Sequence, residues 1–344
     1  MEQLTDGTLM LELMQRPAFR VKDNIITKLN VPAAKLFLRE GLCLDSILES
    51  GAGDYKAFSG GMLYLTLTIF GQNFGASVIR AGEEDVFILD QQFESEELRI
   101  LALAARELRG PLSNAMLAAQ QLEIPEGKAS NLNRSLYQLL RIIGNMSDAS
   151  GVSPVFRPEP QHICALFQEI VEKAAALTAP LGTGICYSGL KEDALCRVDR
   201  QLMERAALNM LSNALKFSPR GGKIQAELRR SGKQFRFSVT DSGSGIPDEE
   251  RATLFTRYLR EPAIEDTRHG IGLGMLLIRN TAARHGGAVL VDHPQDAGTR
   301  ITMTFTDAMT DEAVLRTSPL WADYAGEQDH ALIELSEFLP TQLY

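Results

Sequence analysis

Three short motifs between residues 209 and 274 carry the side chains of this sequence that are best suited to chemistry. An amide oxygen can bind Mg²⁺, a lysine can meet phosphate as a point charge, and a carboxylate can accept a hydrogen bond from an exocyclic amine. Glycines at a helix start leave backbone N–H groups open to phosphate. In chain order the motifs read Asn209-Met-Leu-Ser-Asn213-Ala-Leu-Lys216, Asp241-Ser-Gly243-Ser-Gly245 and Gly270-Ile-Gly272-Leu-Gly274. Together they predict a nucleotide pocket.

The first motif is predicted to lie on a helix. Asn209, Asn213 and Lys216 are three or four residues apart and therefore project from adjacent turns of one face. Two amides at the border of an apolar face cost free energy unless they bind something. Taken alone, the motif also fits two asparagines that cap neighbouring loops.

The second motif follows a predicted strand that ends at Asp241, and the third opens a helix. Gly243 and Gly245 let the backbone turn sharply and pass close to a flat ring. Alone, this Asp-Ser-Gly segment also fits an ordinary turn. The glycine run has the spacing G-x-G-x-G, so it is not a dinucleotide-binding fingerprint, and it lacks the Gly-Lys-Ser/Thr end of a Walker loop.

The elements that must position these motifs lie between residues 158 and 306, where predicted helices and strands alternate. The pattern predicts helices at 164–177, 199–217 and 275–285, and strands at 184–187, 223–229, 234–241, 288–292 and 299–305. This alternation predicts a two-layer α/β sandwich.

Residues 91–151 are predicted to form a helical hairpin. Apolar residues recur at three- and four-residue intervals over about 94–123 and 129–146, and Pro125-Glu-Gly127 separates the two runs. Such a hairpin cannot cover its own apolar stripe, so we expect dimerisation into a four-helix bundle. The alternative is packing of the stripe on a neighbouring domain.

The two ends of the chain are predicted to be separate parts. Residues 1–90 read as a small α+β domain that resembles a PAS-type sensor, and residues 307–344 read as a tail with a short helix after Asp329 that docks on the same chain. The sensor domain is predicted to hold a hairpin at 17–21 and 25–29, a helix at 32–38, and strands at 62–69, 74–80 and 85–89. The whole chain is therefore predicted to have a multidomain α+β fold.

Composition limits the classes of partner. The 344 residues suffice for two or three domains, and the net charge of −9 argues against nucleic-acid binding. Four cysteines without a C-x-x-C pair favour buried, reduced thiols over a zinc site or a disulfide framework. No apolar run reaches the ~20 residues that a membrane span needs, and no signal peptide is visible, so we expect a cytoplasmic protein.

The ordered triple of motifs resembles the nucleotide-binding domain shared by sensor histidine kinases, gyrase-type ATPases and Hsp90, known as the GHKL or Bergerat fold. The resemblance covers about residues 199–305 and implies ATP and Mg²⁺ as ligands. Asn213 would hold Mg²⁺ with help from Asn209, Lys216 would contact phosphate, and Asp241 would read the adenine amine. The other nucleotide-binding positions that it implies are Gly243 and Gly245 beside the ring, Phe255, Tyr258, Gly270, Gly272, Gly274 and Thr299, with residues 256–269 as a lid over the phosphates.

One position separates the branches of this family. Gyrase-type ATPases and related serine kinases carry a glutamate four residues before the metal-binding asparagine, and here that position is Asn209. An amide cannot act as a general base, so hydrolysis and serine phosphorylation are disfavoured. The histidine-kinase branch is favoured, since a histidine acceptor is itself nucleophilic.

The usual phospho-acceptor of that branch is missing. The family motif reads His-Glu-Leu-Arg-x-Pro-Leu, and this chain has Arg106-Glu107-Leu-Arg-Gly-Pro-Leu112. Arg106 is always protonated and cannot accept phosphate, while Glu107 remains as the candidate catalytic residue. None of the five histidines falls on the predicted hairpin.

Two interpretations follow from this substitution. In the first, the chain binds ATP but cannot phosphorylate itself, and works as a nucleotide-responsive dimer or as the partner subunit of an active kinase. In the second, it phosphorylates a histidine on another protein. The partners implied are a second copy through residues 91–151, a response regulator and a partner kinase.

Overall fold

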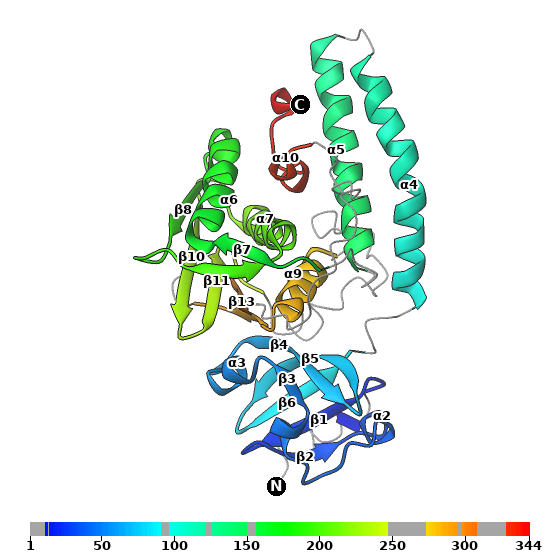
Figure 1. Cartoon of the computed structure of the whole chain (residues 1–344), viewed down its shortest axis with the longest axis vertical. Helices are drawn as coiled ribbons and strands as arrows, with labels where there is room; N and C mark the ends of the chain where they lie inside the picture. The colour runs from blue at the N-terminus through cyan, green and yellow to red at the C-terminus, as the bar shows by residue number, and fades with distance from the viewer. Residues whose placement is uncertain are drawn as a thin grey trace.

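The computed structural model describes residues 11–12, 14–90, 96–121, 125–149, 156–246, 273–294, 298–307 and 328–344. These residues form an N-terminal sheet, a long helical hairpin and an α/β sandwich with a short C-terminal segment against it (Figure 1). The predicted multidomain α+β organisation is confirmed for the hairpin and the sandwich.

The N-terminal part is an antiparallel sheet in the order β2-β1-β6-β5-β4, with β3 also paired to β4. Asp23 and Asn24 both have positive φ in the β1–β2 turn, a backbone geometry that Asp and Asn tolerate in tight hairpins. The predicted helix at 32–38 is shorter, because Phe37 has a φ of 61° and cannot continue it. The elements are β1 (Ala18–Lys22), β2 (Ile25–Leu29), α2 (Val31–Lys35), β3 (Leu48–Ser50), α3 (Ala52–Lys56), β4 (Met62–Ile69), β5 (Gln72–Ala81) and β6 (Glu84–Leu89).

The hairpin consists of α4 (Glu96–Gln120) and α5 (Glu126–Ala149), packed along their length. Its inner face is a small apolar core that includes Leu112, Leu136 and Leu140. The sequence pattern predicted that residues 125–127 separate the two helices. This prediction is wrong in part, because α5 already begins at Glu126. The carbonyl oxygen of Pro125 accepts the first helical hydrogen bonds, from the N–H groups of Lys128 and Ala129.

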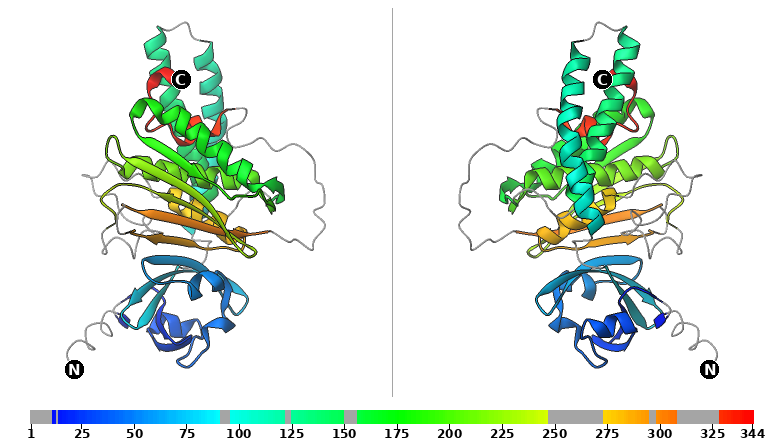
Figure 2. Two further views of the ribbon diagram at one scale, coloured as in Figure 1. Left: turned by 90° about the vertical axis from the view of Figure 1, so that its left-hand side faces the viewer. Right: turned by 90° about the vertical axis from the view of Figure 1, so that its right-hand side faces the viewer.

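The sandwich has one sheet in the order β12-β13-β11-β10-β8, in which only the β8–β10 pair is parallel among the described strands. Its helices α6, α7 and α9 cover one face (Figure 2). Strands β7 and β9, which pair with each other away from this sheet, were not predicted. The elements are β7 (Glu159–His162), α6 (Ile163–Thr178), β8 (Gly184–Ser188), β9 (Leu195–Val198), α7 (Arg200–Phe217), β10 (Lys223–Ser231), β11 (Gln234–Thr240), α9 (Leu273–Arg284), β12 (Val289–Asp292) and β13 (Arg300–Thr306).

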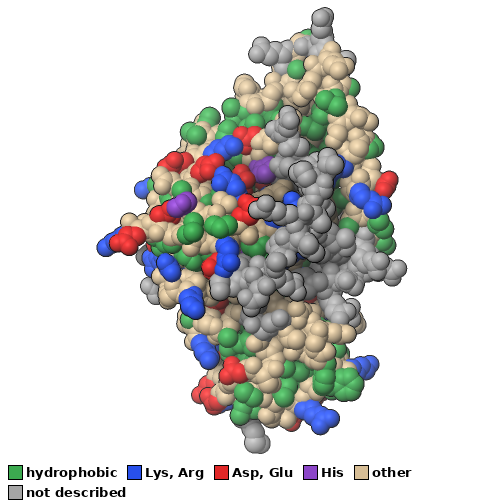
Figure 3. Space-filling view, in the orientation of Figure 1, with side chains coloured by type: hydrophobic (Ala, Val, Ile, Leu, Met, Phe, Trp, Pro, Cys, Tyr) green, Lys and Arg blue, Asp and Glu red, His purple; other side chains and the backbone are tan. Residues whose placement is uncertain are grey.

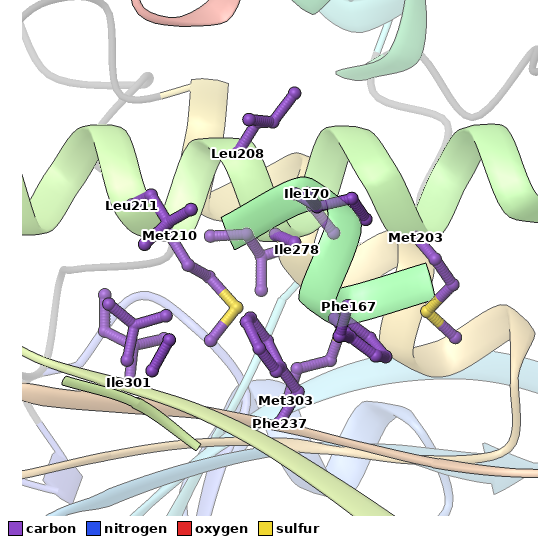
Figure 4. Close-up of a cluster of buried hydrophobic side chains, with 14 of the residues drawn as sticks. Phe167, Ile170, Met203, Leu208, Met210, Leu211, Phe237, Ile278, Ile301 and Met303 are labelled. Carbon is purple, nitrogen blue, oxygen red and sulfur yellow. The ribbon is translucent and has the colours of Figure 1, made fainter. Parts of the chain in front are cut away.

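The sandwich core forms where the helices meet the sheet (Figure 4). Phe237 of β11 stacks on Phe167 of α6 with ring centroids 4.2 Å apart. The alternating apolar residues of β11 face inward as predicted, and Phe235, Phe237 and Val239 are all buried. This packing fixes α7 above the sheet and so determines where the first motif lies.

The two sheets join into one. Strand β4 pairs antiparallel with β12, with Leu63 opposite Leu290, so each strand covers the edge of the other. Beside this junction, the buried Asp54 accepts hydrogen bonds from Gln234 and Thr304 at 2.9 Å. Burial raises the pKa of Asp54, and these bonds partly offset that effect.

The C-terminal segment packs between the hairpin and the sandwich and contains α10 (His330–Glu334) and a 3₁₀ turn at Thr341–Leu343 (Figure 1).

On the face shown in Figure 3, acidic and basic side chains are interspersed over the sandwich. The four cysteines are free thiols, but the prediction that they are buried is wrong for the exposed Cys43 and Cys186 and holds fully only for Cys196, because Cys164 is half-buried. Within the described residues, no helix is long and apolar enough to span a membrane.

Candidate nucleotide site

Two glycines mark the places where the predicted motifs touch. A β-carbon added to Gly243 would lie 2.4 Å from the carbonyl oxygen of Phe217, at the end of α7. One added to Gly274, in α9, would lie 2.8 Å from Oδ1 of Asn209. No real β-carbon approaches a heavy atom so closely, so glycine at 243 lets two backbones meet and glycine at 274 leaves room for the side chain of Asn209. The fold therefore brings the first motif into contact with both of the others.

Helix α7 carries the amides and the lysine. It begins after Asp199, whose carboxylate accepts a hydrogen bond from the N–H of Leu202, and it ends at Phe217, one residue before the Ser218–Pro219 pair. Asn209 is 2% exposed. Its amide nitrogen donates to the carbonyl oxygen of Arg205 at 2.9 Å and to Glu334 at 3.1 Å. Two acceptors thus fix which end of this amide is the nitrogen, and its oxygen faces Gly274.

Asn213 and Lys216 lie further along α7. Asn213 is half-buried, and its amide nitrogen contacts Sδ of Met275 at 3.6 Å, so its oxygen is the atom suited to a hard cation. No group of three or more His, Cys, Asp and Glu side chains in the described parts of the chain could hold a metal. Mg²⁺ is often bound by one or two protein ligands together with water and substrate phosphate, and a single amide oxygen fits that pattern.

Asp241 is held at the end of β11 by backbone groups. Its Oδ1 accepts from the N–H of Gly243 at 2.8 Å and from that of Thr299 at 3.0 Å, and its side chain is 6% exposed. Burial raises the pKa of this carboxyl group, and the two backbone donors act in the opposite direction. No donor from the described residues reaches Oδ2 of Asp241. The carboxylate can therefore accept a further hydrogen bond from a ligand.

The backbone around Asp241 is equally close-packed. A β-carbon on Gly298 would lie 2.2 Å from Oδ1 of Asp241, and Gly245 has a φ of +80°, where a side chain is strained. Thr299 is 7% exposed and pairs its N–H and C=O with Asp241. The predicted positions Asp241, Gly243, Gly245 and Thr299 thus form one wall.

Some predicted positions lie outside the described residues. These are Phe255, Tyr258, Gly270, Gly272 and the predicted lid at 256–269. On the hairpin, Arg106 and Glu107 are both highly exposed on α4, with side chains 74% and 76% accessible, and they form a loose ion pair at 3.4 Å.

A charged cluster that was not predicted lies beneath the first motif. Arg205 is 2% exposed and donates to Glu334 at 3.2 Å and to Asn145 of α5 at 3.1 Å. A buried arginine one turn before Asn209 implies a buried partner. That partner is 129 residues away in the chain, so local spacing could not identify it.

Comparison with known families supports the nucleotide domain. Residues 198–309 match the family described as histidine kinase-, DNA gyrase B-, and HSP90-like ATPase. The match includes α7, β11, α9 and β13, which carry the described parts of the site. The predicted GHKL-type domain is confirmed for these residues.

Similar proteins are sensory kinases. The adaptive-response sensory kinase SasA of Synechocystis sp. is 31% identical over 231 residues, 62% of this chain and 60% of that protein. SasA of Prochlorococcus marinus is 29% identical over 210 residues, 59% of this chain and 55% of that protein. The chain thus spans little more than half the length of these curated relatives. The crystal structure of full-length ShkA in complex with AMPPNP has a similar fold, with a TM-score of 0.51 and 22% identity over 62% of this chain and 47% of that chain.

Proposed function

Taking residues 198–309 as an ATPase domain of the histidine kinase, gyrase B and Hsp90 family, we propose that this chain is a sensor histidine kinase-like protein of a two-component system. It binds Mg-ATP in the sandwich and does not phosphorylate itself at the usual position. The observation that carries the proposal is the close contact of Gly243 and Gly274 with the two ends of the first motif. A pocket for a flat base and a phosphate chain requires the motifs to lie this close together.

The residues have separate roles in binding. Oδ2 of Asp241 accepts a hydrogen bond from the adenine amine. Oδ1 of the same carboxylate is already bonded to the N–H groups of Gly243 and Thr299. The amide oxygen of Asn213 holds Mg²⁺, and Lys216 meets phosphate. Bound Mg²⁺ supplies charge neutralisation to the phosphates. The remaining positions complete the pocket; these are Gly245 and Thr299 beside the base, and Phe255, Tyr258, Gly270, Gly272 and Gly274 around the phosphates and lid.

Asn209 supports the histidine-kinase branch. It occupies the position of a general base in the hydrolytic branch, but its amide carries no basic nitrogen. Its buried contacts with Arg205 and Glu334 further give it a positioning role within α7. We therefore place neither ATP hydrolysis nor serine phosphorylation in this site.

Arg106 decides the reaction outcome in this proposal. Its guanidinium is exposed on α4, where the family places an acceptor histidine, and it cannot take up phosphate. The chain then acts as a nucleotide-responsive dimer or as a partner subunit of an active kinase. The second candidate, favoured by the otherwise intact motif around Glu107, is transfer to a histidine on another protein, with a response regulator downstream.

We also propose that the N-terminal sheet is the sensor. Its strand order β2-β1-β6-β5-β4, with short helices between β2 and β4, supports the PAS-type resemblance. Its pairing with the sandwich through β12 gives it direct contact with the nucleotide domain.

Phosphate labelling tests the proposal. The chain incubated with γ-labelled Mg-ATP is expected to carry no acid-labile label, while the Arg106→His variant gains one. Arg106→Lys is the matched control and should stay unlabelled. Acid-labile label on the unaltered chain contradicts the proposal. If Arg106→His binds ATP but no phosphate moves, even to a histidine-bearing partner, the non-enzymatic form of the proposal is the one that stands.

A further inference from the structure

The segment 328–344 belongs to two cores at once. Leu335 and Leu339 are fully buried in the core of the sandwich, and Ile333 is fully buried in the core of the hairpin. Figures 1 and 2 show the segment, coloured red, between the hairpin and the helices of the sandwich. It therefore ties the nucleotide domain to α5.

Side chains of helix α5 bind the backbone carbonyl groups of the segment. The guanidinium of Arg134 donates to the carbonyl oxygens of Ser336 at 3.1 Å and Glu337 at 2.7 Å. Gln138 donates to the carbonyl oxygen of Ser336 at 3.3 Å. Because these bonds use only backbone carbonyl groups, the carboxylates of Glu334 and Glu337 can bind other groups.

Glu334 is fully buried and is the first of two carboxylates that the segment presents to α7. Its Oε1 accepts from Arg205 at 3.2 Å, and its Oε2 accepts from Asn209 at 3.1 Å. Arg141 of α5 lies 3.5 Å from the same oxygen. A buried carboxylate is stable only with such partners, so this contact fixes the segment against the first motif.

Glu337 is the second carboxylate and is 40% exposed. It lies 3.1 Å from Arg141 and 3.5 Å from Nζ of Lys216. Lys216 is the cation that the proposed function assigns to phosphate. In this conformation that cation faces a carboxylate of its own chain.

We propose that the segment 328–344 is an autoinhibitory latch on the nucleotide site. Glu337 competes with nucleotide phosphate for Lys216, while Glu334 and the apolar residues clamp the domain to the hairpin. The inference rests on the proposed function, because it takes Lys216 as a phosphate ligand. Coupling between two events at one residue is reciprocal, so nucleotide must loosen the segment by the factor by which the segment weakens nucleotide binding.

The Glu337→Gln variant tests the latch in the full chain, because Glu337 is partly exposed and its loss leaves both cores intact. Glu169→Gln is the matched control, since it removes an exposed ion pair, with Arg200, elsewhere on the sandwich. Titration with Mg-AMPPNP should give about three- to fivefold tighter binding for Glu337→Gln and no change for Glu169→Gln. Unchanged or weaker binding by Glu337→Gln overturns the latch and leaves the proposed function standing. Absence of binding by every form overturns both.

Hydrogen exchange separates a latch from simple removal of a negative charge. The N–H groups of Ile333, Leu335 and Leu339 are bonded within the segment. Saturating Mg-AMPPNP should speed their exchange in the unaltered chain severalfold, because the segment loosens when phosphate takes Lys216. Exchange that is unchanged or slowed by nucleotide overturns the latch.

Discussion

At the scale of single residues, the charged form of Asp241 lowers the stability of the fold, while its carboxylate has a proposed role in nucleotide binding. Burial favours its neutral form, so its pKa is raised. A carboxyl group whose pKa is higher in the folded state contributes stability below its unfolded-state pKa, and that contribution is lost as the pH rises through the folded-state pKa. At neutral pH the charge at this position therefore works against the fold, which is common at functional sites.

Asp241→Asn should separate these two effects. The asparagine keeps an oxygen for the N–H groups of Gly243 and Thr299, but it offers an N–H₂ group to the adenine amine. We expect nucleotide affinity to fall at least about tenfold, in line with ~1.5–3 kcal/mol for a hydrogen bond to a charged group. The melting temperature without nucleotide should not fall, and any gain should be larger at pH 7 than at pH 4. Calorimetric titration and thermal unfolding measure the two; unchanged affinity contradicts the assigned role.

The site residues that could be predicted from sequence are those with local spacing. Asn213, Lys216 and Asp241 lie in short motifs, and the structure connects those motifs through glycines that were themselves predicted. The partnership of Arg205 with Glu334 could not be predicted, because it depends on how a distant segment returns to α7. Residues whose role is set by long-range packing leave no local pattern.

At the scale of elements, the hairpin exposes apolar side chains with heptad spacing. Leu103 and Leu117 of α4 are 53% and 57% exposed and lie fourteen residues apart, and Leu132 and Leu139 of α5 are exposed seven residues apart. Such a repeat is typical of helices that pack against further helices. This arrangement supports the predicted homodimer through residues 91–151.

Leu103→Glu should therefore convert a dimer into a monomer, because a charge would enter the apolar seam. Light scattering coupled to size exclusion measures the mass. Lys128→Glu, at an exposed position near the turn, is the control and should remain dimeric. A monomeric unaltered chain, or a Leu103→Glu variant that stays dimeric, contradicts the proposed interface.

Two of the elements that were not predicted lack an apolar period. Strand β7 is largely exposed and contains a proline, so it shows no alternation. Helix α3 has five residues, too few for a helical repeat to appear. The other strands and helices of the sandwich were predicted because each packs apolar side chains into the core.

At the scale of the whole molecule, the pairing of β4 with β12 makes one sheet of two parts. No local pattern could predict it, since edge strands from separate parts of the chain meet there. Gly61 stands at this junction with a φ of +85°, and a β-carbon on it would lie 2.5 Å from the carbonyl oxygen of Val291. The junction depends on glycine at this position.

Gly61→Ala should loosen the junction, and Gly82→Ala provides the matched control. Gly82 also has a positive φ, +69°, but a β-carbon there meets nothing within 4 Å. Both variants should lose about 1 kcal/mol for the left-handed backbone, and Gly61→Ala about 1–3 kcal/mol more for the clash. Thermal unfolding and hydrogen exchange of β4 and β12 measure the difference; equal behaviour of the two variants contradicts the close fit.

Calorimetric titration of the chain with Mg-ATP tests whether the assembled motifs form a Mg-ATP pocket. We expect saturable binding below millimolar nucleotide, with a large loss in Asn213→Ala because its amide oxygen holds Mg²⁺. Repeating the titration without Mg²⁺ should remove most of the difference between the two proteins. No binding at millimolar Mg-ATP, or binding that Asn213→Ala leaves unchanged, would contradict the account.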